Sequence, residues 1–164
     1  MYRNDCLLCK IAQKIEFSHI IWENENYMAF LSIFPNTPGV TVVIPKEHCS
    51  SYYADVDDRI ISELMIIVKK VSLILDEAFD DVARTAMVFE GFGIDHLHAK
   101  LYPMHGTKQY SKQWESIAST SDVFFEKYPG YITTENSHFR QHSCSDLAEL
   151  AQRIRDISKK QEGD

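Results

Sequence analysis

The most informative stretch of the sequence is His96-Leu97-His98-Ala99-Lys100, in which polar and apolar side chains alternate. If this stretch is a β-strand, its two-residue period places both histidines and Lys100 on one face, with Leu97 and Ala99 on the other. The apolar face suits a hydrophobic core. The polar face brings together two imidazoles and an ammonium, which a reaction at phosphorus can use as nucleophile and cationic donors. The alternative is an exposed polar strand whose histidines form only local hydrogen bonds.

Around this stretch the sequence predicts further strands and two helices. Runs of β-branched and aromatic residues bounded by Asn, Gly and Pro are typical of strands. The strands are expected at 18–23, 27–31, 40–44, 85–89 and 96–102. Apolar residues at helical spacing predict a long helix from Asp55 to about Phe79, which Asp55 or Asp57 can cap, and a C-terminal helix over 143–160. The fold expected is α+β, an antiparallel sheet with the long helix packed on one face and an additional C-terminal helix.

Length, composition and charge exclude several classes of protein. The 164 residues suffice for one domain with a hydrophobic core, and 45% of them are hydrophobic. A net charge of −7 argues against a nucleic-acid partner, which needs a basic face, but a local cationic cluster can still bind a small anion. Charged residues interrupt the long apolar runs and the N-terminus lacks a secretory pattern. We therefore expect a cytoplasmic protein with no membrane partner.

The four cysteines are Cys6, Cys9, Cys49 and Cys144. In a reducing cytoplasm two disulfides are not expected, so the closely spaced pair Cys6 and Cys9 points to metal or redox chemistry. Buried or reactive thiols without a metal are the alternative. Thioredoxin-like chemistry fits poorly, because the pair precedes the first expected strand and lacks the strand-then-helix setting.

The chain resembles the histidine triad (HIT) family of nucleotidyl hydrolases and transferases, from Cys6 to about Pro103. Four blocks in the family's order carry the resemblance, and their order and spacing are more specific than any one of them. The blocks are Cys6-Leu7-Leu8-Cys9-Lys10-Ile11, Phe30-Leu31-Ser32-Ile33-Phe34-Pro35, Thr37-Pro38-Gly39-Val40-Thr41-Val42-Val43-Ile44-Pro45-Lys46-Glu47-His48 and Asp95-His96-Leu97-His98-Ala99-Lys100-Leu101-Tyr102-Pro103.

The resemblance implies an activity and a set of site residues. In the family, the middle histidine of the signature attacks the α-phosphorus and carries a covalent nucleotidyl intermediate, while a backbone carbonyl fixes its tautomer. That role falls on His98, with His96 and Lys100 completing the catalytic set. The bond cleaved would be a phosphoramidate or a phosphoanhydride. The residues expected to contact the nucleotide are Phe30, Ser32, Ile33, Glu90 and Gly93. Core packing for Phe30 and Ile33, and a solvated turn for Glu90, are the alternatives.

The resemblance also implies a metal, an assembly and a division of the chain. Some bacterial members bind zinc through residues that correspond to Cys6, Cys9, His48 and His96, a closed structural site. The family typically forms homodimers through the long helix and a sheet edge, and we expect the same here. Residues 1–106 would form the HIT-like nucleotide-binding core, and residues 107–164 a C-terminal extension packed on the same domain.

Four residues depart from the family pattern. Lys100 replaces the third histidine of the triad, and Val40 stands where a histidine usually follows Pro-Gly. Ser32 replaces the acidic residue or Asn that holds the ribose hydroxyls, and Gly93 replaces a hydroxyl residue that contacts phosphate. The nucleophile is retained, whereas the usual substrate contacts are not. A second hypothesis is therefore a zinc-stabilised nucleotide-binding or adaptor protein with little or no turnover.

Overall fold

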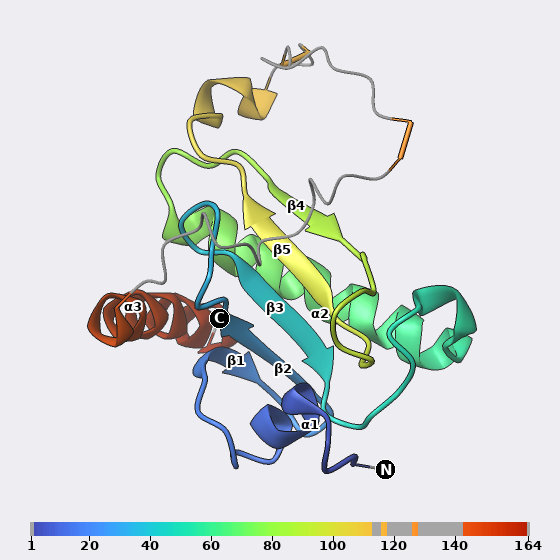
Figure 1. Cartoon of the computed structure of the whole chain (residues 1–164). Coiled ribbons are helices and arrows are strands. Elements are labelled where there is room, and N and C mark those ends of the chain that lie inside the picture. The colour runs from blue at the N-terminus through green and yellow to red at the C-terminus, as the bar shows by residue number, and fades with distance from the viewer. Residues whose placement is uncertain (1, 113–115, 118–125, 128–142, 164) are drawn as a thin grey trace.

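The computed structural model describes residues 2–112, 116–117, 126–127 and 143–163. Within them, antiparallel strands form a single sheet in the order β1-β2-β3-β5-β4 (Figure 1). The strands are β1 (His19–Glu23), β2 (Tyr27–Leu31), β3 (Thr41–Pro45), β4 (Thr85–Val88) and β5 (Ala99–Pro103). The helices are α1 (Leu7–Ala12), α2 (Asp58–Ala78) and α3 (Cys144–Gly163), with 3₁₀ turns at Tyr53–Asp55 and Lys108–Lys112. The predicted α+β fold is confirmed.

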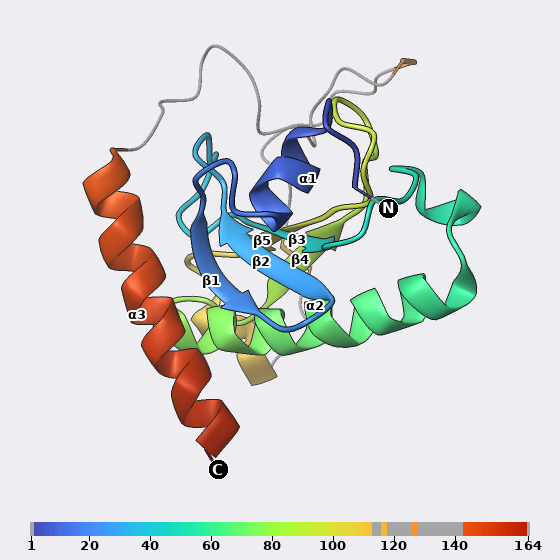
Figure 2. The same cartoon turned by 90° about the horizontal axis from the view of Figure 1, so that it is seen from below.

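The helices cover opposite faces of the sheet. Figure 2 shows α2 along one face, α1 over the other, and α3 beside β1. The apolar stripe of α2, which includes Leu64, Val71 and Leu75, packs with strand residues in a main core of twenty buried residues among those described. A smaller cluster of eight buried residues joins α1 to the opposite face of β2 and β3. The sheet thus separates a large core from a small one.

Local chemistry sets the ends of these elements. The Asn24 side chain accepts hydrogen bonds from the backbone N–H groups of Asn26 (3.0 Å) and Tyr27 (2.7 Å), which fixes the β1–β2 hairpin turn. Of the two aspartates expected to cap the long helix, Asp57 does so, accepting from the Arg59 N–H at 2.9 Å. α2 accordingly begins at Asp58, three residues after the predicted start.

The C-terminal helix packs against the edge of the sheet. Leu147, Ala151 and Ile154 of α3 belong to the main core. Arg155 donates to the backbone carbonyl of Ile20 at 2.6 Å, beside an irregularity in the β1–β2 pairing. This contact covers part of an edge strand that would otherwise present unpaired backbone groups. Much of the segment before α3 lies outside the described residues, and with it most of the first half of the predicted 107–164 extension.

One prediction about local structure is wrong, and one helix was not predicted. The last strand begins at Ala99 and not at His96, because nearby backbone groups bond elsewhere: the Leu97 N–H donates to the Cys49 carbonyl (3.2 Å) and the His96 carbonyl accepts from a side chain. In addition, α1 was not foreseen. Its capping residue is Cys6, whose sulfur accepts from the Cys9 N–H at 3.4 Å. No described helix combines the length and hydropathy of a membrane span.

Candidate functional site

The histidine stretch keeps its predicted alternation although part of it precedes β5. Leu97, Ala99 and Leu101 are fully buried in the main core. His98 and Lys100 lie on the opposite side, where they line a cavity of about 430 Å³. Both side chains are largely buried, with 6% and 9% of their surface exposed. A nucleophile candidate and a cation thus share one sheltered space.

The ring of His98 is held by the chain's own backbone. Its Nδ1 lies 2.7 Å from the carbonyl oxygen of His96. A carbonyl can only accept a hydrogen bond, so Nδ1 must donate, and in the neutral imidazole the lone pair is then on Nε2. This is the tautomer that nucleophilic attack through Nε2 requires.

The cavity lies between α1 and the sheet, and its walls are mostly apolar. It brings together five of the residues predicted for the site: Phe30, Ser32, Ile33, His98 and Lys100. Apolar side chains from α1, from the loop before β1 and from the segment before the histidines complete much of the wall, among them Leu7, Leu8, Ile11, Phe17 and Ile94. An ammonium in such apolar surroundings is stabilised by an anion, so the chemistry suits a phosphate attached to a flat or apolar group.

Two other predicted contacts lie elsewhere. Glu90 and Gly93 are not among the described residues that line the cavity. Gly93 has a φ of 88° and borders a neighbouring hollow with Arg3 and Asp95. Ser32 does line the cavity, but its hydroxyl accepts from the Phe34 N–H at 3.2 Å. That bond occupies part of the hydroxyl's capacity toward a ligand.

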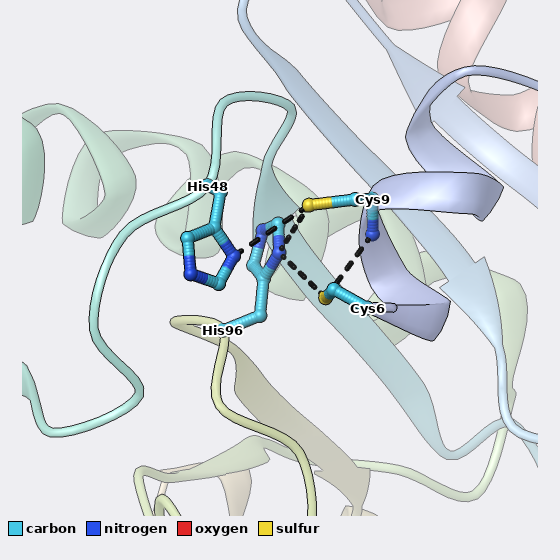
Figure 3. Close-up of side chains that lie close together, drawn as sticks. All are labelled: Cys6, Cys9, His48 and His96. Carbon is cyan, nitrogen blue, oxygen red and sulfur yellow. Dashed lines mark hydrogen bonds between the residues drawn. The ribbon is translucent and has the colours of Figure 1, made fainter. Parts of the chain in front are cut away.

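A second cluster of chemically active side chains lies beside the cavity. Cys6 caps α1 and Cys9 lies within it, while His48 comes from the loop after β3 and His96 from the segment before β5 (Figure 3). One possible ligand atom from each lies within 4.8 Å of all the others. His96 Nδ1 is 3.5 Å from both sulfurs, and His48 Nδ1 is 3.5 Å from the Cys9 sulfur.

These distances match the requirement of a tetrahedral metal site. With Zn–S of about 2.3 Å and Zn–N of about 2.0–2.1 Å, a tetrahedral angle gives an S···N separation of about 3.6 Å. His96 also carries the right tautomer: its Nε2–H donates to the Pro45 carbonyl at 2.9 Å, which leaves the Nδ1 lone pair toward the sulfurs. Burial lowers the pKa of His96 to about 4 and raises the pKa of the Cys9 thiol. The donor set therefore fits zinc, whose charge would favour the thiolate.

His96 belongs to both sites. Its imidazole contacts the cysteine sulfurs, and its carbonyl holds His98. α1 is shared as well, because Cys6 and Cys9 face the metal cluster while Leu8 lines the cavity. Sequence reasoning did not assign Leu7, Leu8, Ile11 or Phe17 to the cavity. The helical spacing of Leu7, Leu8 and Ile11 after Cys6 was the available signal for α1.

Comparison with known sequences gives a consistent group of relatives. A family model described as the HIT domain matches residues 13–105. An uncharacterized HIT-like protein of Mycoplasma pneumoniae is 31% identical over 111 residues, covering 65% of this chain and 76% of the relative. An adenosine 5′-monophosphoramidase of Schizosaccharomyces pombe is 28% identical over 99 residues, covering 60% of this chain and 73% of the relative.

Solved structures support the fold over nearly the whole length. A hypothetical histidine triad nucleotide-binding protein of Sulfolobus tokodaii superposes with a TM-score of 0.69 at 24% identity, covering 96% of this chain and 94% of that one. A zinc-bound histidine triad family protein of Mycobacterium smegmatis gives a TM-score of 0.67 at 17% identity, covering 97% and 96%. At these identities the likeness concerns the fold.

Proposed function

The chain belongs to the HIT domain family, and on that basis we propose that it is a nucleoside phosphate hydrolase or nucleotidyl transferase with His98 as its nucleophile. The single observation that carries the proposal is the 2.7 Å contact between His98 Nδ1 and the His96 carbonyl, inside a cavity that also holds Lys100. One relative is a phosphoramidase, which supports a phosphoramidate as the bond that is cleaved. A phosphoanhydride is the other candidate, because the nucleophile would attack the same α-phosphorus.

In the first step the Nε2 lone pair of His98 forms a bond to the α-phosphorus of the bound nucleotide. The bond from phosphorus to the leaving amine or phosphate breaks, and that group departs with the electron pair; a leaving amine takes up a proton from solvent, whereas a leaving phosphate departs as the anion. The Nδ1–H bond to the His96 carbonyl stabilises the ring as it gains positive charge. The product is a nucleotidyl-histidine at position 98.

In the second step water, or another acceptor hydroxyl for a transferase, attacks the same phosphorus. The Nε2–P bond breaks, its electron pair returns to His98, and the attacking oxygen gives its proton to solvent. Lys100 would bind a non-bridging phosphate oxygen through both steps and balance the charge that develops there. His96 acts through its backbone carbonyl and so serves as a positioning residue. Phe30 and Ile33 would contact the base, and Ser32 the sugar. Glu90 and Gly93 do not line the cavity, so its geometry does not support them as nucleotide contacts.

We propose further that Cys6, Cys9, His48 and His96 hold a structural zinc ion. A closed set of four protein ligands leaves no position for water, so the ion would supply a cross-link between chain segments and no catalytic chemistry. The S···N separations of 3.5 Å support this assignment. The zinc-bound relative of M. smegmatis is in agreement.

We also propose that the protein works as a cytoplasmic homodimer. Ile66 and Leu73 on the outer side of α2 are 67% and 54% exposed, and β4 pairs with a strand on one side only in the described part of the chain. An apolar helix face beside an open sheet edge suits pairing with a second copy. A reducing compartment keeps the cysteines available as metal ligands.

Trapping of the covalent intermediate tests the enzymatic proposal. The protein is mixed with adenosine 5′-phosphoramidate or a dinucleoside polyphosphate, quenched within the first turnover and digested for mass spectrometry. The expected result is one added nucleotidyl group on the peptide that contains His98, and no adduct on the His98→Asn variant. An adduct at another residue, or turnover by His98→Asn at the wild-type rate, would refute His98 as the nucleophile.

The same experiment distinguishes the second hypothesis, a zinc-stabilised nucleotide-binding or adaptor protein with little or no turnover. The presence of Lys100 in the cavity, where the family pattern has the third histidine, favours that hypothesis, because an ammonium can bind a phosphate oxygen but cannot act as a neutral imidazole. Binding of adenosine 5′-monophosphate without adduct formation or turnover of either substrate would support it.

A further inference from the structure

The helix α1 lies between the metal cluster and the nucleotide cavity and contributes to both. Its capping residue Cys6 and its residue Cys9 face His48 and His96 (Figure 3). Leu7, Leu8 and Ile11 from α1 line the cavity, and the loop that follows contributes Phe17. One short element therefore carries half of the metal ligands and a wall of the cavity.

This wall has little stability of its own. α1 has six residues, and helices shorter than about 12–15 residues are marginal in water without tertiary anchors. Its apolar anchors belong to the smaller cluster, eight buried residues against twenty in the main core. Residues 13–18 then lead to β1 with few bonds to the sheet; one is the exposed ion pair between Lys14 and Glu23 at 2.9 Å. Further anchors are the contacts of both cysteines with His96, the contact of Cys9 with His48, and an exposed ion pair between Arg3 and Asp95 at 3.1 Å just before the helix.

We infer that occupation of the Cys6–Cys9–His48–His96 site by zinc orders α1 as the wall of the cavity, so that zinc and nucleotide bind cooperatively. The inference rests on the proposed function, to which it adds a form of regulation. Ligation by both cysteines fixes α1 against the segment before β5. The nucleotide then binds to a wall that is already ordered, so its binding free energy does not include the cost of ordering α1. Coupling between two sites is reciprocal, so the nucleotide must raise the affinity for zinc by the same factor.

The main core lies on the other face of the sheet, so the zinc-free chain is expected to stay folded with a loosened wall. Hydrogen exchange of the full chain, with and without zinc, tests this directly. Amides of residues 6–17 should exchange faster after chelation, while amides of α2 and β2 should keep their protection. Equal exchange of residues 6–17 in the two forms would overturn the inference.

Calorimetry with adenosine 5′-monophosphate tests the coupling. Removal of zinc should weaken the affinity at least about fivefold, the lower end of typical couplings between sites. Saturating nucleotide should raise the zinc affinity, measured by competition with a chelator, by the same factor. Equal nucleotide affinity in both forms would overturn the inference. If the nucleotide binds neither form, the nucleotide proposal fails, and the exchange of residues 6–17 still decides whether zinc orders the wall.

Two cysteine variants provide the matched control. Cys9→Ser removes one ligand, so in the presence of zinc it should behave as the zinc-free protein in both measurements. Cys49→Ser removes a thiol that packs against the main core outside the cluster and should keep the zinc effect. A Cys9→Ser protein that still shows full wild-type protection of α1 and full nucleotide affinity would contradict the inference.

Discussion

At the scale of single residues, Lys100 is the most informative position, because its charge is buried in the cavity beside His98. Lys100→Gln keeps much of the volume and removes the positive charge. We expect kcat/KM to fall by about 10²–10³, the effect typical of removing one donor to a developing oxyanion. Lys100→Arg should recover part of the loss, because it restores a cation. Steady-state kinetics with adenosine 5′-phosphoramidate measure kcat/KM for the three proteins. An unchanged kcat/KM in Lys100→Gln would show that Lys100 does not bind the phosphate.

Phe17 is a second residue whose position invites a test. It lines the cavity although 76% of its surface is exposed, and Ile33, also on the rim, is 43% exposed. Base stacking on an aromatic ring contributes about 1–3 kcal/mol, so Phe17→Ala should weaken the binding of adenosine 5′-monophosphate by about tenfold. Calorimetry provides the measurement. Ile15→Ala is the control, being 68% exposed on the same loop and outside the cavity lining. Equal affinity in the two variants would exclude a stacking role.

At the scale of elements, a hydrogen bond to His105, just after β5, holds the loop between β2 and β3. His105 lies with Nδ1 3.0 Å from the Asp81 carboxylate and Nε2 3.0 Å from the Pro38 carbonyl. The ring of His105 thus bridges the segment after α2 and the β2–β3 loop. Gly39 is required beside Pro38, because its φ is 79° and a Cβ there would meet the Phe79 ring at 2.6 Å. The loop that carries Ser32 and Ile33 is thus positioned from outside the cavity.

The hydrogen bond between His105 and Asp81 predicts that the stability of the protein depends on pH. The hydrogen bond from His105, followed by that from the Gly106 N–H, lowers the pKa of Asp81 below its ordinary value of 3.8. A carboxylate with a lowered pKa in the folded state adds stability above its ordinary value and loses it as pH falls through the folded pKa. Asp81→Asn should therefore lower Tm at pH 7, and the difference from the wild type should shrink below about pH 4. Asp80→Asn is the matched control, and equal Tm profiles for both variants would contradict the assignment.

At the scale of the whole molecule, the outer side of α2 is the contact that we propose for the homodimer. If Ile66 and Leu73 are buried against a second copy, Leu73→Glu places an unpaired charge in the interface and should dissociate it. Light scattering after size exclusion should then give 19.0 kDa for the variant and twice that mass for the wild type. Lys160→Gln, at an exposed position of α3, changes the net charge equally and should leave the mass unchanged. A monomeric wild type would refute the dimer.

The sequence made much of this molecule predictable because periodicity is local. Alternation of polar and apolar residues around Leu97 and Ala99 predicted which side chains enter the core, and they do. Helical spacing located α2 and α3 to within a few residues. The helix α1 was missed because the spacing of Leu7, Leu8 and Ile11 extends over only six residues and is a weak signal. The start of β5 was predicted too early because a sequence pattern does not show the hydrogen bond from His98 to the His96 carbonyl.

By itself the sequence determined which reactive groups are present and which fold class they belong to. The groups are two histidines beside a lysine and a pair of cysteines, and the fold class is α+β. The family resemblance implied the set Cys6, Cys9, His48 and His96, whereas the residue pattern alone left open which groups meet, and that was decided by the tertiary structure. The order β3-β5 brings His48 and His96 together, and α1 folds across the same face to deliver Cys6 and Cys9. The physical reason is that contacts between residues about forty and ninety positions apart depend on chain topology and on how each face of the sheet is covered. No local pattern encodes them.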